Sequence, residues 1–208
     1  MKPVFELTGG RLCLDFANTV DDRPTIDPTD RLKTYSDLLV FGEQTGIFRP
    51  SEVHALRRLA MTRVREAAER FHRAIALREN IFLVFSAVAA NSKPPLKDVW
   101  ALNAALRTMN AHAVVLPKNG RFTWVWRDNK KTIDRLLWEI TRSAIDLLTS
   151  NDMKLVKQCA ADDCDWLFID SSRSHNRRWC EMRTCGNRHK AKDYYRRRTE
   201  DRKRSSGS

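Results

Sequence analysis

Two short cysteine pairs decide how this chain is organised: Cys159-Ala-Ala-Asp-Asp-Cys164 and, fifteen residues later, Cys180-Glu-Met-Arg-Thr-Cys185. Each pair can offer two thiolates to one ion with little loop-closure entropy, and four intervening residues lie within the range of structural zinc sites. Four thiolates close a tetrahedral shell and leave no position for a catalytic water. We therefore expect one structural Zn²⁺, held by Cys159, Cys164, Cys180 and Cys185.

Two other uses of these residues stay open at this point. Four cysteines can also form two disulfides, although disulfides are typical of exported proteins. The amino end reaches Glu6 and Arg11 without the apolar stretch of a signal peptide. His175 or His189 could replace one sulfur. The fifth cysteine, Cys13, lies between two leucines and is expected to be a buried apolar residue.

Charge is concentrated in the same part of the chain as these cysteines. The 208 residues carry a net charge of +12, and 31% of them are charged. From Ser171 to Arg204, thirteen Lys or Arg stand against four Asp or Glu. Such an excess attracts polyanions. No apolar run of about 18 residues is present to span a bilayer, so we expect a soluble protein with no membrane contact. Because the amino end also lacks a signal-peptide core, we expect the protein in the cytoplasm.

A polar break at Ser150-Asn151-Asp152 divides the chain, and residues 150–158 are the candidate linker. We expect a mainly helical domain over residues 1–150, a zinc finger with a basic helix over residues 151–204, and a flexible tail over residues 205–208. The fold class is mainly α with a small β-hairpin (α+β), followed by a small treble-clef-like zinc finger.

The helices follow from apolar spacing. Apolar residues recur in steps of three or four from Val53 to Phe85, which predicts one or two helices over residues 51–89. The stripe from Ile133 to Leu148 predicts another helix. A shorter helix before them is expected to have Ser36 as its N-cap and Gly46 at its carboxyl end.

One segment has a different period. Val114–Leu116 and Phe122–Trp126 flank Lys118-Asn119-Gly120, and an Asn-Gly step between such runs predicts a β-hairpin. Phe122, Trp124 and Trp126 would share one face. The favoured interpretation is that this aromatic face covers the helices; the alternative is that it forms the wall of a pocket.

The cysteine segment has the element order of a treble-clef finger. Trp166–Asp170 reads as a strand that leaves the first cysteine pair, and residues 186–196 read as a helix that follows the second. Because the last cysteine would lie at the start of this helix, the metal would set the position and direction of the basic segment.

The basic helix and the loop before Cys180 together offer donors to nucleic acid. Mobile cations suit phosphates, whereas forked Arg and Asn side chains suit base edges. The alternative is a solvated basic surface or a disordered tail. The expected nucleic-acid-binding residues are Arg173, Arg177, Arg178, Asn187, Arg188, Lys190, Lys192, Tyr195 and Arg196.

Residues 159–198, with Trp179-Cys180 and the intact Cys185-Gly186-Asn187-Arg188, resemble the CGNR-type zinc finger. The stretch Arg11-Leu-Cys-Leu-Asp-Phe-Ala-Asn-Thr19, followed by Asp22-Arg23, resembles the opening of the ABATE domain, which precedes this finger in bacterial proteins described as stress-induced transcription regulators. The two resemblances cover nearly the whole chain. They imply a bacterial regulator that binds double-stranded DNA, with the four late cysteines as zinc ligands.

The role of the front domain is less defined by this resemblance. Asp15, Asn18 and Arg23 are polar groups beside an apolar segment. Such residues usually cap helices or make hydrogen bonds in the core. The alternative is a pocket for a small-molecule effector, which would give the front domain a sensory or regulatory role.

Rival functions are an RNA-binding finger, a protein adaptor and, less favoured, a treble-clef nuclease. His175, Asn176, Asn187 and His189 supply residue types that such nucleases use, but no paired His-His step or carboxylate cluster accompanies them. We therefore expect no enzyme activity. A homodimer is compatible with two-fold symmetric operators, although no heptad repeat indicates one.

Overall fold

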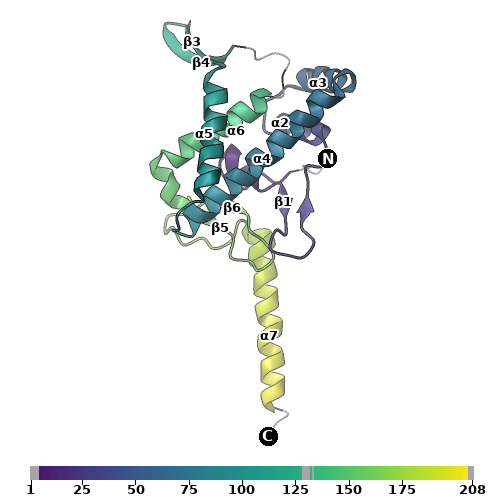
Figure 1. Ribbon diagram of the computed structural model, residues 1–208. Helices are drawn as coiled ribbons and strands as arrows, with labels where there is room; N and C mark the ends of the chain where they lie inside the picture. Colours follow the sequence, from purple (N-terminus) through teal and green to yellow (C-terminus); the bar gives the residue numbers. More distant parts are fainter. Residues whose placement is uncertain (1–4, 128–131, 133, 206–208) are drawn as a thin grey trace.

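The computed structural model describes residues 5–127, 132 and 134–205, and Figure 1 shows a helical body from which two elements project. Three two-stranded antiparallel sheets accompany the helices. The predicted fold class, mainly helical with a β-hairpin and a carboxyl-terminal finger, is confirmed. The helices of the body are α1 Leu12–Ala17, α2 Tyr35–Gln44, α3 Pro50–Thr62, α4 Val64–Ala89, α5 Leu96–Asn110 and α6 Asp134–Leu148. The strand pairs are β1 Val20–Asp21 with β2 Thr29–Asp30, β3 Ala113–Lys118 with β4 Arg121–Trp126, and β5 Val156–Gln158 with β6 Leu167–Ile169. A 3₁₀ turn η1 Asn151–Leu155, a wide helical turn η2 Met182–Gly186 and the helix α7 Asn187–Ser205 complete the carboxyl-terminal part.

The short helix α1 lies at the centre of the body and packs against α4 and α6. Its residues Leu14 and Phe16 are fully buried, as are Ile81 of α4 and Ile140 of α6. Cys13 is also fully buried, as expected, and burial raises the pKa of its thiol to about 12. The thiol therefore stays protonated and behaves as a small apolar side chain.

The structure decides two questions about helix boundaries, the division of residues 51–89 and the N-cap of α2. Residues 51–89 form two helices, because the backbone leaves helical geometry at Arg63, with φ −128° and ψ 53°. The prediction of Ser36 as an N-cap is wrong. Thr34 caps α2, and its side chain and that of Asp37 each accept a hydrogen bond from the other's backbone N–H. Ser36 could not form such a reciprocal pair of hydrogen bonds, because the residue three positions after it, Leu39, has no side-chain acceptor.

Two further predictions concern the carboxyl end of α2 and the start of α6. Gly46 follows α2 with φ 76°, as the predicted stop requires. Ile133, the first residue of the predicted apolar stripe, lies outside the described residues, and α6 is described from Asp134.

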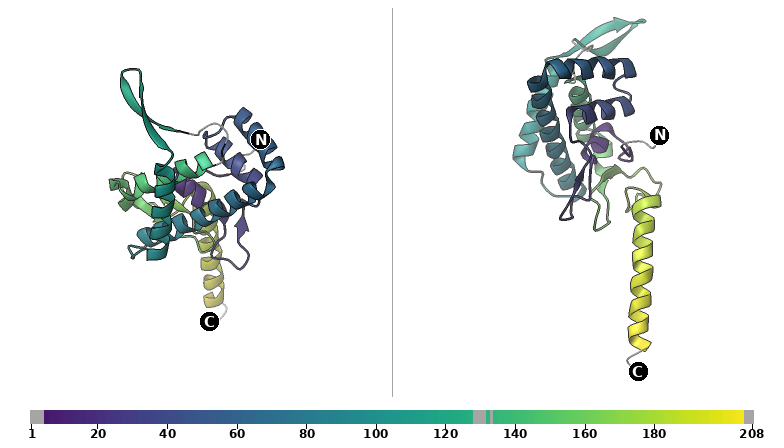
Figure 2. Two further views of the ribbon diagram at one scale, coloured as in Figure 1. Left: turned by 45° about the horizontal axis from the view of Figure 1, so that its top comes forward. Right: turned by 90° about the vertical axis from the view of Figure 1, so that its right-hand side faces the viewer.

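The predicted hairpin is confirmed, with Asn119 and Gly120 at φ 51° and 73° in its turn. Its aromatic face does not cover the helices as a whole, and that interpretation is wrong for two of the three rings. Trp126 packs on Trp138 with ring centres 5.3 Å apart, but the side chains of Phe122 and Trp124 are 78% and 59% exposed. The reason is that the hairpin projects beyond the body (Figure 2), where the outer part of its face meets no helix.

Residues 150–158, the expected linker, are folded against the body. Residues 151–155 form η1, and β5 follows without a break. Val156 of β5 and Leu167 of β6 belong to the same buried cluster as the helices. The hairpin β5–β6, which carries the first cysteine pair, therefore shares its core with the helical body.

Hydrogen bonds fix this hairpin in register on the body. The buried Asn18 amide donates to the Leu167 carbonyl and accepts from the Leu167 N–H, both at 2.8 Å. The Trp166 indole N–H donates to the Val20 carbonyl at 3.1 Å. One amide side chain thus replaces a missing strand partner for β6, because it satisfies both backbone groups of one residue.

The predicted division at residue 150 remains a prediction, since the two parts are in contact. Residues 206–208 of the predicted tail lie outside the described residues, and Ser205 is the last residue of α7. Within the described ranges, no helix combines the length and apolar character needed to cross a membrane.

We predict that Asn18→Ala destabilises the protein by about 2–4 kcal/mol, because it leaves the buried N–H and C=O of Leu167 without partners. Urea unfolding followed by circular dichroism measures the change. Asn103→Ala is the matched control, since it removes an amide whose bond, to the Val99 carbonyl, lies within one helix. Equal stabilities for the two variants would contradict the assigned role of Asn18.

Candidate metal centre and nucleic-acid interface

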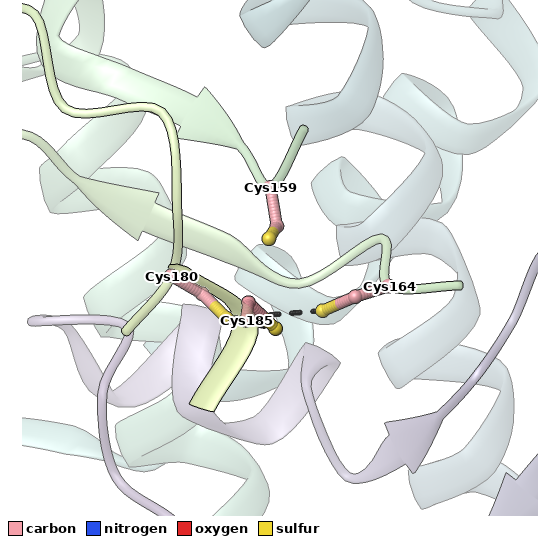
Figure 3. A group of neighbouring side chains, drawn as sticks. All are labelled: Cys159, Cys164, Cys180 and Cys185. Atoms are coloured by element: carbon pink, nitrogen blue, oxygen red, sulfur yellow. Dashed lines mark hydrogen bonds between the residues drawn. The ribbon is translucent and has the colours of Figure 1, made fainter. Parts of the chain in front are cut away.

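The four late cysteines converge from two loops (Figure 3). Cys159 and Cys164 lie between β5 and β6, whereas Cys180 precedes η2 and Cys185 lies within it. Their sulfurs are all buried and lie within 4.8 Å of one another. The separations are 3.7 Å for Cys164 and Cys180, and 3.5 Å for Cys180 and Cys185.

These separations fit a metal centre and not disulfides. A tetrahedron with Zn–S bonds of about 2.3 Å has S–S edges of about 3.8 Å, whereas a disulfide bond is about 2.05 Å long. No two of the five cysteine sulfurs are bonded to each other, so the geometry favours the metal centre over two disulfides. His175 and His189 do not belong to the four-residue cluster, and the described residues thus offer four sulfurs.

The electrostatics of the cluster favour a cation at its centre. Thiols of Cys164 and Cys180 can donate to the Cys159 sulfur, which lowers the pKa of Cys159. The pKa values of Cys164 and Cys180 are raised by the same hydrogen bonds and by burial. Among Cys159, Cys164 and Cys180, hydrogen bonding therefore favours the charged form of Cys159 alone, whereas a bound divalent cation favours the thiolate form of each sulfur that it contacts.

Backbone hydrogen bonds shape both cysteine loops. The Cys159 N–H donates to the Trp166 carbonyl at 2.8 Å, which closes the first loop. The second loop contains Gly186, where a Cβ would lie 2.3 Å from the Met182 sulfur and 3.2 Å from the Trp179 ring. A side chain at this position would therefore displace the half-exposed Met182 side chain and press on the Trp179 ring.

Asp170 holds the loop between β6 and Cys180. Its carboxylate is fully buried, receives the Lys157 ammonium at 2.6 Å, and accepts from the Ser172 hydroxyl and the Arg177 N–H. Burial opposes the charge of this group, but these donors more than offset it and hold the pKa of Asp170 well below its usual range. The loop is thus anchored by a charged group at neutral pH.

Several of the predicted nucleic-acid-binding residues make contacts within the finger, among them Arg177, Arg188 and Lys192. Arg177 donates to the carbonyls of Trp179 and Cys180, and its guanidinium lies 4.5 Å from the centre of the Phe168 ring. Arg188 lies 3.1 Å from the Asp163 carboxylate and 3.5 Å from the Cys185 sulfur. Lys192 lies 3.4 Å from the same carboxylate.

The other predicted residues lie on the outer surface. Asn187 and Lys190 belong to the first turn of α7, which extends away from the body (Figure 1). Arg173 and Arg178 come from the loop before Cys180. The structure thus brings the loop and the start of α7 together at the cluster, and the rest of α7 continues outward. Arg177 is partly buried, whereas the exposed members of the predicted set are Arg173, Arg178, Asn187, Arg188, Lys190, Lys192, Tyr195 and Arg196.

Comparison with protein families decides the affiliation of the chain. Residues 10–151, more than half of its length, match the ABATE family, whose description is "Putative stress-induced transcription regulator". The chain belongs to the ABATE family. Residues 156–198 match the CGNR zinc finger. Both resemblances noted in the sequence are therefore confirmed, and neither description names an enzyme. No curated protein matches the chain.

Sequence reasoning missed two features of the CGNR finger. Asp163, which precedes Cys164, pairs with Arg188 and Lys192 and so ties α7 to the first cysteine loop. Trp179 packs on His189 with ring centres 4.4 Å apart. A carboxylate inside the cysteine loop was a usable signal for the first feature, since a basic helix was expected nearby.

The polar residues at the front of the ABATE domain are engaged by the protein itself. Asp15 accepts from the Gly9 N–H at 2.8 Å, and Asn18 binds Leu167. Arg23 forms an ion pair with Glu79 at 2.7 Å, and its guanidinium lies 4.0 Å from the centre of the Phe82 ring. These contacts favour the hydrogen-bonding interpretation over a pocket formed by these three residues.

We predict that Cys180→Ser loses the bound metal and exposes residues 170–198 to proteolysis, because three sulfurs no longer close the shell. The helical body should keep its far-ultraviolet circular dichroism. Elemental analysis of purified protein gives the metal content. Cys13→Ala, at a buried thiol outside the cluster, is the control and should keep one zinc per chain; native metal content in Cys180→Ser would refute the assignment.

We also predict a pH dependence that originates at Asp15. Burial raises the pKa of this carboxyl group to about 6. The folded state therefore holds a proton that the unfolded state has lost, and stability decreases as pH rises through this range. Between about pH 5 and about pH 7.5, the wild type should lose about 1 kcal/mol relative to Asp15→Asn. Parallel urea titrations at the two pH values measure it; identical pH profiles would contradict the assignment.

Proposed function

We propose that this ABATE-family protein is a zinc-dependent DNA-binding protein that acts as a bacterial transcription regulator. One structural Zn²⁺, held by Cys159, Cys164, Cys180 and Cys185, would orient α7 towards double-stranded DNA. The observation that carries the proposal is the position of four buried, clustered sulfurs at the root of an exposed basic helix. The reduced cysteines suit the cytoplasm.

The metal acts through structure in this proposal. A shell of four thiolates is closed and carries a net charge that nearby cations offset. Arg188 lies beside the Cys185 sulfur and the Asp163 carboxylate. Arg188, Arg177 and Lys192 therefore brace the finger, and we assign any contact that they make with DNA to the inner edge of the interface.

The outer residues suit the contacts of a duplex. Nineteen residues of α7 span about 28 Å at 1.5 Å per residue, and the major groove admits an α-helix. Asn187 and Lys190 are exposed on the first turn of α7, and Arg173 and Arg178 are exposed on the loop before Cys180. We propose that these four residues, with Tyr195 and Arg196 further along, bind phosphates and base edges.

In this proposal the chain has two domains, residues 1–150 and residues 151–204. The first of them, the ABATE domain, has a regulatory role. Because β6 is bonded to Asn18 and its Leu167 lies in the core of the body, a change in packing around α1 would reach the finger directly. A small-molecule effector that binds the ABATE domain could therefore alter the orientation of α7.

RNA is the second candidate partner, and one observation favours it. Tyr194 and Tyr195 are both exposed on α7, and exposed aromatic rings stack on unpaired bases. Duplex DNA remains first, because the basic residues extend along a single straight helix that has the dimensions of the major groove.

Selection of bound sequences from a random pool of duplexes, with and without a chelator, tests the proposal. We expect enrichment of a defined site that the chelator abolishes. Competition by unrelated duplex distinguishes a DNA binder from an adaptor for acidic proteins, and a single-stranded RNA pool tests the second candidate. Nicking of supercoiled plasmid with magnesium, lost in His189→Ala, would instead support a nuclease and overturn the proposal.

We predict that Lys190→Ala combined with Arg197→Ala lowers the slope of log affinity against log salt by about two, since each phosphate contact contributes about 0.9. Both side chains are exposed on α7. Fluorescence anisotropy with a labelled duplex at several salt concentrations measures the slope. Arg65→Ala, which removes a 94% exposed arginine from α4, is the control and should leave the slope unchanged. An unchanged slope in the double variant would show that the outer face of α7 does not contact DNA.

A further inference from the structure

The hairpin β3–β4 is an arm with one entirely apolar face. The register pairs Ala113 with Trp126, Val115 with Trp124, and Pro117 with Phe122, and directly paired residues point to the same side. All six side chains of this face are apolar. The opposite face carries Val114, Leu116 and Val125 and also Thr123 and, at the tip, Lys118 and Arg121. The polar side chains of the paired residues are thus confined to that face.

Little of this face is buried by the chain itself. Phe122 and Trp124 are 78% and 59% exposed, and Val115 is 49% exposed. A two-stranded hairpin on its own is at best marginally stable in water, and exposed apolar patches mark contact sites between proteins. Trp126 at the base meets Trp138, so the uncovered part lies towards the tip.

A cavity of about 610 Å³ opens at the base of the same arm. Ala113, Trp124 and Trp126 of the apolar face line it, and Leu106, Met109 and Ile145 are among the other apolar residues of its lining. The apolar face of the arm therefore continues into a hollow. An aromatic ring at the tip and a hollow at the base lie on one surface, about 13 Å apart for four strand residues.

We propose that this surface is the interface of a homodimer. Two arms laid face to face and antiparallel about a two-fold axis place each tip over the other's base, so that Phe122 of each copy enters the cavity of its partner. A knob and a hole on one patch satisfy the self-complementarity that a two-fold interface requires. Because a second copy supplies both features at once, it fits better than an unrelated apolar partner.

The area of the surface agrees with this occupant. The cavity is lined by Glu139 and Asp146 and also by Arg135 and Arg142, so its formal charges cancel and the match with a second copy is one of shape and apolar area. Exposed aromatic side chains contribute on the order of 100–150 Å² each. With Val115, Pro117 and the walls they cover, two arms bury on the order of 1,000–1,500 Å², the range of a stable interface.

A dimer contact at the arm would not block the proposed binding of DNA by α7. The arm projects from the end of the body opposite to α7 (Figure 1). The basic helices therefore lie outside the interface, and their mutual repulsion does not oppose association at the arm. The dimer itself does not rest on the proposed DNA binding, since the groups that form it lie in the ABATE domain.

Sedimentation equilibrium of the zinc-loaded full chain, without nucleic acid, tests the proposal. We expect a mass twice that of one chain, with dissociation on dilution. Phe122→Ser and Trp124→Ser should each raise the dissociation constant of the dimer about tenfold or more, as for buried aromatic anchors. Both side chains are largely exposed in one chain, so the variants should fold normally, which circular dichroism checks.

Trp100→Ser is the matched control, because Trp100 is 64% exposed on α5 and lies outside the arm. It should leave the dissociation constant unchanged. Ala113→Phe fills the hollow from within and should weaken the dimer as Phe122→Ser does; an unchanged dimer in this variant would overturn the seating of Phe122. A wild type that stays monomeric at every concentration, with the arm bare or covered by another partner, overturns the proposal. DNA affinity is measured separately, so the two proposals fail independently.

Discussion

Four buried sulfurs within 4.8 Å of one another can all be deprotonated only if a cation lies among them. The finger depends on this constraint. Between β6 and α7 it has little apolar core, and its buried cluster consists of the cysteines, Trp166 and Phe168. Around this cluster the local contacts are polar and reciprocal: Asp170 anchors the loop, and Asp163 ties Arg188 to the first cysteine pair. In the finger, metal binding and hydrogen bonds provide the stability that burial of apolar side chains provides in the helical body.

The finger is also coupled to the ABATE body, which a separate zinc module would not be. Asn18 satisfies both backbone groups of Leu167, and Leu167 lies in the main core. The start of α7 therefore has a defined orientation relative to α1. In a regulator, such a connection lets an event in the body alter the presentation of the basic helix without a hinge.

The two projecting elements differ in chemistry, and this difference indicates two kinds of partner. The arm β3–β4 is apolar on one face and ends in a basic tip, whereas α7 is polar throughout its length. Apolar surface favours another protein surface, and cationic surface favours a polyanion. Because the elements lie at opposite ends of the body, both contacts can form in one assembly.

The sequence by itself determined the features that depend on local rules: the cysteine spacing, the Asn119-Gly120 turn, the apolar periods of the helices and the basic character of α7. Only the tertiary structure decided which polar and charged side chains make contacts with other residues of the chain. Arg177 and Arg188, which the sequence predicts to bind DNA, also contact Trp179, Cys180 and Asp163 within the finger, and Asn18, one candidate for a pocket, binds Leu167. The exposure of Phe122 and Trp124 likewise could not be read from alternation, because a strand pattern shows which side chains share a face but not whether anything covers it. Such pairings join residues up to 149 positions apart, and their energies depend on distances that local sequence does not encode.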